Sequence, residues 1–223
     1  MHFLDVPTLL QVSGLFNLTA ALAWLALAQL FRIAPRAGRL MAAAHVLRFA
    51  TQGCTGCLAG WTPLLRVAVT EFGALACMVL LLLALRRMVR SRLRPRDIMW
   101  IGGLGAASIA AGLAAGSGLL PQLASTAAVT LLAGLAVREV VRGVARALST
   151  PITAFTALPF VVLVLLGTLH FGELLVEPGW AERALRGDLP TPWRAVLWCV
   201  VTLGLTLSLI ALMIWRVIAR IQH

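Results

Sequence analysis

The chain has 223 residues, of which 61% are hydrophobic and 12% charged, and its mean hydropathy is +0.95. This composition excludes an ordinary soluble domain, and the length allows about seven spanning helices of roughly 20 residues but no sizeable globular domain. A formal charge of +11 would suggest a nucleic-acid partner in a soluble protein. Here we interpret it as the anchoring charge of a membrane protein, whose partner is the lipid bilayer and not nucleic acid.

All 19 basic residues are arginines, and they alternate between the connections of seven apolar stretches. Most lie in the first, third and fifth connections or after the last stretch: Arg32, Arg36, Arg39, Arg86, Arg87, Arg90, Arg92, Arg94, Arg96, Arg138, Arg142, Arg146, Arg216 and Arg220. The other connections hold only Arg66, Arg183, Arg186 and Arg194. Because positive charge stays on the cytoplasmic side of a membrane, the pattern predicts an all-α integral membrane bundle of seven transmembrane helices. The N-terminus is predicted outside and the C-terminus in the cytoplasm.

The predicted helices form a single domain, 1–223, and span residues 7–31, 39–61, 65–85, 98–120, 122–141, 151–175 and 193–218. The fourth is rich in glycine, and its Gly112-x-x-x-Gly116 spacing is typical of close helix packing in lipid. Pro159 predicts a kink in the sixth helix. The one long outer connection is 176–192. The last helix carries no stop signal, so we expect its helicity to continue into the cytoplasm.

Several polar side chains are predicted at the outer level of three helices, where ionisable groups are costly and therefore candidates for function. They are Cys54, Cys57, Glu71, His170 and Glu173. Two thiolates, an imidazole and a carboxylate suit zinc or copper, so Cys54, Cys57 and His170 are candidate metal ligands. The same residues could form a redox-sensing dithiol, a pocket without metal, or ordinary packing contacts, and the sequence leaves these alternatives open.

The second predicted helix carries a polar face of His45, Arg48 and Gln52, which completes the candidate ligand-binding set. No acidic residue is predicted at the depth of Arg48, so we expect its guanidinium to extend toward the cytoplasm. No cofactor is indicated. Retinal is excluded because its Schiff base needs a lysine and the chain has none. No phosphate loop, nucleophile elbow or zinc-protease motif is present, so we do not expect this chain to be an enzyme.

The opening Leu4-Asp5-Val6-Pro7-Thr8-Leu9-Leu10-Gln11-Val12 resembles the start of multi-span sensor regions of bacterial diguanylate cyclases of the GGDEF family. The resemblance continues in the apolar span that closes on an arginine run between Glu71 and Arg96. It includes the ending Trp215-Arg216-Val217-Ile218-Ala219-Arg220-Ile221-Gln222-His223, which is similar to the exit from the membrane toward a signalling helix. The resemblance implies a sensor in the bacterial inner membrane that controls cyclic di-GMP synthesis by a cytoplasmic output domain. No GGDEF domain is present in these 223 residues.

Three functions remain open from the sequence. The first is a sensory input module that binds an outer-side or lipid-phase signal and controls an output domain as a homodimer through the last helix. The second is a small transporter or channel, although the middle of the fifth and seventh predicted helices is almost wholly apolar. The third is a membrane-embedded scaffold subunit.

Overall fold

The computed structural model describes residues 6–30, 32, 34–53, 60–89, 93–144, 150–186 and 192–221. Within these ranges the chain is almost entirely helical and contains no strand. The elements are α1 (Val6–Gln29), α2 (Pro35–Arg48), the π-helical segment η1 (Phe49–Gly53), α3 (Pro63–Val89), α4 (Pro95–Ala114), α5 (Leu119–Val144), α6 (Thr150–Val176), α7 (Gly179–Arg186) and α8 (Pro192–Ile221).

Proline marks the start of each long helix. Counting α2 and η1 as one segment, all seven long helices have a proline among their first three residues: Pro7, Pro35, Pro63, Pro95, Pro121, Pro151 and Pro192. The first turn of a helix tolerates proline because its backbone N–H groups have no partner within the helix, and the fixed φ of proline favours the helical backbone. The connections therefore end where these prolines allow a new helix to begin.

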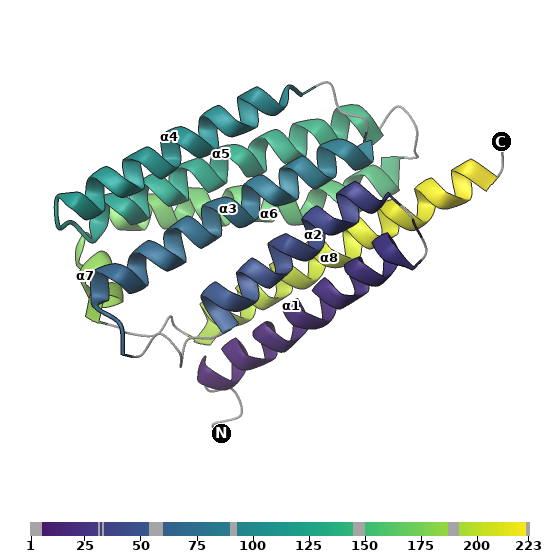
Figure 1. Ribbon diagram of the computed structural model, residues 1–223. Coiled ribbons are helices and arrows are strands. Elements are labelled where there is room, and N and C mark those ends of the chain that lie inside the picture. The colour runs from purple at the N-terminus through teal and green to yellow at the C-terminus, as the bar shows by residue number, and fades with distance from the viewer. Residues whose placement is uncertain are drawn as a thin grey trace.

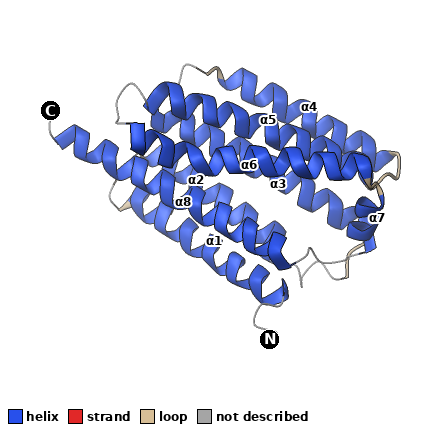
Figure 2. Cartoon of the chain, turned by 180° about the vertical axis from the view of Figure 1, so that it is seen from behind, coloured by secondary structure: helices blue, strands red, loops and turns tan. Residues whose placement is uncertain are grey.

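The long helices run alternately up and down, so the start of α1 and the end of α8 lie at opposite ends of the bundle (Figures 1 and 2). Six of them close into a ring, in which each contacts the next in the order α1, α2, α3, α5, α6, α8 and back to α1. Helix α4 lies outside this ring against α3 and α5. The ring encloses the space in which the candidate site is found.

The connection that was predicted as a long outer loop contains the short helix α7. It lies at the end of the bundle where α3 begins (Figure 1) and contacts α3, α5 and α6. The Gln122 side chain donates a hydrogen bond from Nε2 to the Ala181 carbonyl oxygen at 3.5 Å. Arg183 pairs with Glu177 at 2.7 Å and stacks over the Trp180 ring. This end of the bundle is thus covered by an ordered helix.

Five helical segments among the described residues are long and apolar enough to cross a membrane: Thr8–Gln29, Pro63–Val89, Pro95–Ala114, Leu119–Gly143 and Ile152–Val176. Many large apolar side chains on them face outward, as Leu104, Leu131 and Leu165 do. Outward leucines suit a bundle surrounded by hydrocarbon. The chain therefore has the character of a multi-pass membrane protein. The α2–η1 segment is more polar, and the apolar part found in α8 is shorter, Cys199–Ile214.

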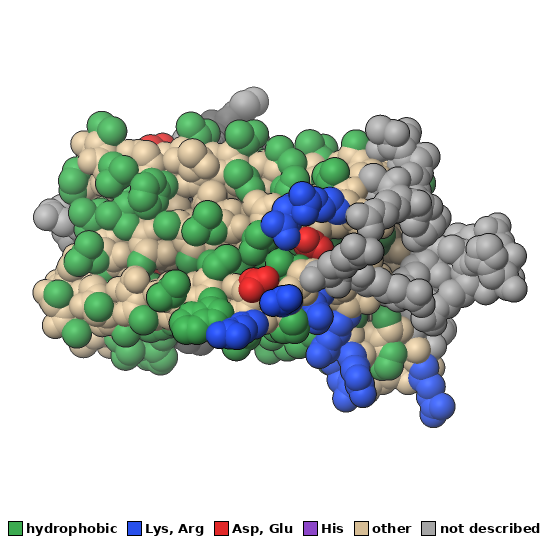
Figure 3. Space-filling view, turned by 90° about the horizontal axis from the view of Figure 1, so that it is seen from above, with side chains coloured by type: hydrophobic (Ala, Val, Ile, Leu, Met, Phe, Trp, Pro, Cys, Tyr) green, Lys and Arg blue, Asp and Glu red, His purple; other side chains and the backbone are tan. Residues whose placement is uncertain are grey.

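The arginines of the first, third and fifth connections that the structure describes gather at one end of the bundle. Figure 3 shows arginine side chains toward one end of this face, whereas hydrophobic side chains are scattered over the other end. Arg86 donates from Nε to the Leu93 carbonyl oxygen at 2.5 Å, and Arg87 donates from Nη1 to the Arg36 carbonyl oxygen at 3.4 Å. The basic connections seen in the sequence are therefore neighbours in space.

Two predicted helix ranges were wrong. The fourth helix, predicted over 98–120, ends at Ala114, and the next begins at Leu119 instead of residue 122. Gly116 adopts a positive φ of 67°, and its N–H bonds the Leu113 carbonyl while the Ser117 N–H bonds the Gly112 carbonyl. This paired pattern is the Schellman helix end. Gly116 therefore terminates the helix and does not take part in helix packing.

The second predicted helix, 39–61, starts earlier, at Pro35, and its described helical residues end at Gly53. Residues 60–62 form a turn and bend ahead of α3. The other predicted helices agree with the structure to within a few residues at each end.

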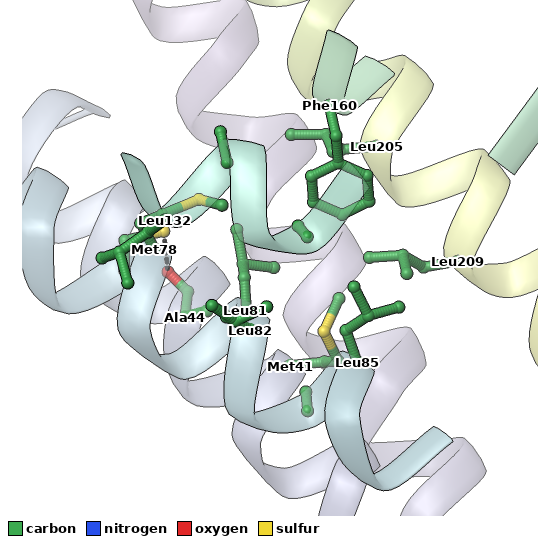
Figure 4. Close-up of a cluster of buried hydrophobic side chains, with 14 of the residues drawn as sticks. Met41, Ala44, Met78, Leu81, Leu82, Leu85, Leu132, Phe160, Leu205 and Leu209 are labelled. Carbon is green, nitrogen blue, oxygen red and sulfur yellow. Dashed lines mark hydrogen bonds between the residues drawn. The ribbon is translucent and has the colours of Figure 1, made fainter. Parts of the chain in front are cut away.

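The core of the bundle is built from leucine, methionine and alanine side chains of several helices. Figure 4 shows Met41, Leu85, Phe160, Leu205 and Leu209 gathered around one point, contributed by α2, α3, α6 and α8. Leu82, Leu85, Leu132, Phe160 and Leu209 are fully buried. In lipid, such packing holds helices together by van der Waals contact because hydrocarbon removes most of the hydrophobic driving force.

Candidate functional site

A cavity of about 200 Å³ lies inside the ring of helices. Five ring segments contribute to its wall: α2, α3, α5, α6 and α8. Its lining residues are Arg48, Thr70, Glu71, Ala74, Cys77, Met78, Leu81, Ser125, Thr126, Val129, Thr130, Leu163, Gly167, His170, Val201 and Leu205. A cavity of this size is smaller than the roughly 300–1,000 Å³ pockets that take drug-sized ligands, so it suits a small molecule.

Close helix approaches fix which residues share a level in this wall. A Cβ added to Gly73 would collide with Thr51, and a Cβ added to Gly167 would collide with Thr130. The glycine at each of these positions lets α3 meet η1 and lets α6 meet α5. These contacts fix the positions of the helices along the bundle axis, and with them the levels of the side chains one or two turns away in the cavity wall.

Arg48 occupies the lower part of the wall, taking the basic end of the bundle as the bottom. Its side chain interacts with the Cys77 thiol, and Cys77 in turn donates a long hydrogen bond from Sγ to the Ala44 carbonyl oxygen at 3.6 Å. The wide π-helical turn of η1 follows Arg48 directly. Single π-helical turns occur frequently at functional sites. This one changes the direction around the helix axis in which the residues after Arg48 project.

Glu71 and His170 occupy the opposite, upper part of the wall. The Ser125 hydroxyl of α5 donates to the Glu71 backbone carbonyl at 3.4 Å and also interacts with the Glu71 carboxyl group. His170 Nδ1 lies 3.3 Å from Glu173 Oε2. The side chains of His170 and Glu173 are 39% and 41% exposed. His170 thus belongs both to the cavity wall and to the surface of the bundle.

A second, much smaller cavity of about 20 Å³ adjoins the first and shares Arg48, Cys77, Leu81 and Leu205 with it. Such a volume holds about one water molecule. His45 lies on its wall, buried, with Nδ1 3.0 Å from Asn17 Oδ1 of α1. Among the described residues its Nε2 has no hydrogen-bond partner. Thr202 and Thr206 of α8 also line this space.

The structure brings together some of the residues singled out in the sequence and separates others. Arg48, Glu71 and His170 line one cavity, His45 lines its smaller neighbour, and Glu173 contacts His170 without joining the wall. Cys54 and Cys57 lie outside the described residues, as does the side chain of Gln52. Among the residues that the structure describes, no three His, Cys, Asp or Glu side chains lie close enough together to hold a metal ion.

Glu71 lines the same cavity as Arg48, but it lies six residues before Cys77 in α3, toward the end opposite the basic connections, so the expectation that no acidic residue lies at the depth of Arg48 is not contradicted. One expectation about these residues needs correction. The middle of the fifth and seventh predicted helices was expected to be almost wholly apolar. Instead, hydroxyl groups of α5 and α8 face the two cavities: Ser125, Thr126, Thr130, Thr202 and Thr206.

These hydroxyls and Asn17 were missed because scattered Ser and Thr in an apolar stretch carry little signal of their own. Thr126 and Thr130 are four residues apart and Thr202 and Thr206 are four residues apart. Such spacing puts each pair on one helical face. A search for polar residues at helical spacing inside apolar spans would have found both pairs.

Comparisons with protein-family models, with curated proteins and with solved structures gave no match to this chain.

Proposed function

We propose that this chain is a membrane sensory input module that binds a small ligand in the cavity and transmits binding through α8. In this proposal the bundle crosses the bacterial inner membrane seven times, with the N-terminus outside and the C-terminus in the cytoplasm. Two copies pair through α8 and control a cytoplasmic output domain. The resemblance to sensor regions of diguanylate cyclases favours a cyclase as that output.

The observation that carries the proposal is the position of α8. This helix contributes Val201 and Leu205 to the cavity wall, and the same helix continues without interruption to Ile221. A ligand in the cavity would therefore touch the element that reaches farthest beyond the basic end of the bundle (Figure 1). In the ring, α8 contacts mainly α6 and α1, so its tilt can change while α2, α3 and α5 keep their mutual packing.

The mechanism follows from the linkage between ligand binding and conformation. A ligand shifts the bundle only by the difference between its affinities for two arrangements of the helices. Because Val201 and Leu205 form part of the wall, an arrangement with α8 displaced has a differently shaped cavity. The ligand that fits one shape stabilises the corresponding position of α8, and the distance between the paired α8 ends changes with it.

The test uses disulfide crosslinking in membranes, in a background whose four natural cysteines are replaced by alanine. A cysteine at Ile221 should give a covalent dimer, whereas one at Leu185 in α7 should not. Filling the cavity with Val129→Trp, or with the smaller change Ala74→Leu, should alter the yield at Ile221. The matched change Leu131→Trp should leave the yield unchanged, because Leu131 faces outward and is 61% exposed.

Equal crosslinking at Ile221 and Leu185, or none at either, would contradict pairing through α8. A yield at Ile221 that neither cavity-filling variant alters would contradict transmission from the cavity.

A small transporter is the second candidate, and the adjoining cavities favour it. Together they place polar groups in series from His170 and Glu71 past Arg48 to His45 and Thr206. Purified protein in liposomes should then move protons or a small solute down an imposed gradient, and His45→Leu should abolish the flux. Liposomes as tight as protein-free ones would remove this candidate.

A further inference from the structure

The cavity has an ionisable side chain near each end of its wall and several apolar side chains. Arg48 of α2 lies beside Cys77 of α3, while Glu71 lies six residues before Cys77, nearer the opposite end of α3. Six residues of α-helix correspond to a rise of about 9 Å. Both residues line the same cavity, and charges inside a membrane protein need compensation by opposite charge or hydrogen bonds.

From this arrangement we infer, building on the proposed ligand-binding function, that the cavity takes a small zwitterion of the amino-acid type. Its carboxylate binds Arg48 and its ammonium group binds Glu71. Each end forms a charge-assisted hydrogen bond, the stronger kind of hydrogen bond in proteins. A ligand with only a negative charge would offer no cationic group to Glu71. A ligand with only a positive charge would offer no anionic group to Arg48.

The cavity volume of about 200 Å³ limits the ligand to a small molecule. An α-amino or β-amino acid carries its ammonium and carboxylate groups on one carbon atom or on two adjacent ones, so both charges fit within such a space. The rest of the cavity then receives the ligand's side chain.

The middle of the wall defines what that side chain can be. Ala74, Val129 and Leu163 contribute apolar surface to the wall, and Thr126 and Thr130 add hydroxyl groups from α5. A branched aliphatic group fits such a wall because it leaves no polar atom of its own unpaired. The hydroxyl groups can accept a hydrogen bond from the ligand's ammonium group or donate one to its carboxylate.

The access route follows from His170. This residue lines the cavity near Glu71, yet its side chain is 39% exposed and pairs with Glu173 at the bundle surface. The ligand's ammonium end therefore lies nearest the opening, and its carboxylate lies deeper, next to Arg48. His170 lies near the end of α6 that adjoins α7, so the proposal puts the ligand's entry toward the end of the bundle opposite the basic connections.

The experiment measures binding to the purified full chain in lipid nanodiscs by calorimetry, with three probes of similar shape. Leucine carries both charges, isocaproate lacks the amine and isoamylamine lacks the carboxylate. We expect leucine to bind at least about tenfold more tightly than either analogue, because each analogue loses one charge-assisted contact. Leucine that binds no more tightly than the analogues, or does not bind, would overturn the inference.

Variants identify the groups that bind each end. Arg48→Gln should reduce leucine binding to the level of isoamylamine, and Glu71→Gln should reduce it to the level of isocaproate. The matched controls Arg39→Gln and Glu177→Gln, which change exposed residues outside the cavity, should bind leucine as the unmodified chain does. Leucine binding unchanged in both cavity variants would also refute the assignment.

If a cavity variant does not fold, the comparison of the three probes on the unmodified chain still decides. The crosslinking test of α8 uses no ligand. If leucine does not bind as expected but the crosslinking result is positive, the zwitterion inference is refuted and the sensor proposal still stands.

Discussion

The contact between α5 and α6 at the cavity gives the sharpest stability prediction. A Cβ added to Gly167 would overlap Oγ1 of Thr130 and approach its Cβ to 3.3 Å. Overpacking of this kind costs about 1–3 kcal/mol when side chains cannot move aside. We therefore expect Gly167→Ala to lower the free energy of unfolding by about this amount, relative to a control with the same gain in helix propensity.

Gly134→Ala provides that control, because a Cβ at Gly134 in the same pair of helices meets no atom within 4 Å. Thr130→Ala removes the hydroxyl that causes the clash. Within the described residues that hydroxyl has no hydrogen-bond partner, so its loss should cost little. The double variant Gly167→Ala, Thr130→Ala should recover most of the lost stability, with a coupling energy within about 0.5–3 kcal/mol.

The assay is a denaturant titration of the purified protein in mixed micelles, carried out for the two single variants, the double variant and the control. If the two substitutions are additive, the close approach of α6 to α5 at the cavity is not as described. The relative positions of His170 and Glu71 along the bundle axis would then no longer be supported.

Three further predictions concern the rest of the bundle. Replacing Asn17 by alanine removes the partner of the buried His45 Nδ1 and should lower the melting temperature, at a cost of about 1–3 kcal/mol; an unchanged melting temperature would contradict the pairing. Gly116→Ala should cost about 1–2 kcal/mol in a denaturant titration, because its φ of 67° is unfavourable for residues with a Cβ; no loss would show that this helix end is not left-handed. A periplasm-active reporter fused after Gly187 and a cytoplasm-active one fused after Arg94 should both give signal, and silence of either would refute the seven-span, N-out topology.

Much of the helical architecture could be predicted from the sequence, because apolar length and the positions of arginines are strong local signals. The helix starts could have been placed better. Pro35 and Pro95 stand at first helical positions, yet the predicted helices began at residues 39 and 98, inside the arginine-rich connections. A first-turn proline is compatible with neighbouring arginines, since basic side chains extend into water from the helix end.

The candidate site could be predicted only in part. Sequence reasoning identified Arg48, Glu71 and His170 as polar residues inside apolar spans, but it placed Arg48 with His45 and Glu71 with the cysteines. Which helices adjoin around the ring depends on side-chain packing between segments far apart in the chain. The contact of α3 with α5, which brings Ser125 to Glu71, has no counterpart in local sequence.

The proposed mechanism requires that the state of the cavity sets the position of α8. The most direct measurement is the distance between spin labels at Ile221 and Arg142 within one chain, in nanodiscs, with labelled chains diluted by an excess of unlabelled ones. Arg142 lies near the end of α5, which serves as the fixed reference. We expect Val129→Trp and Ala74→Leu to shift this distance distribution while Leu131→Trp leaves it unchanged. Identical distributions in all of these proteins would contradict the account.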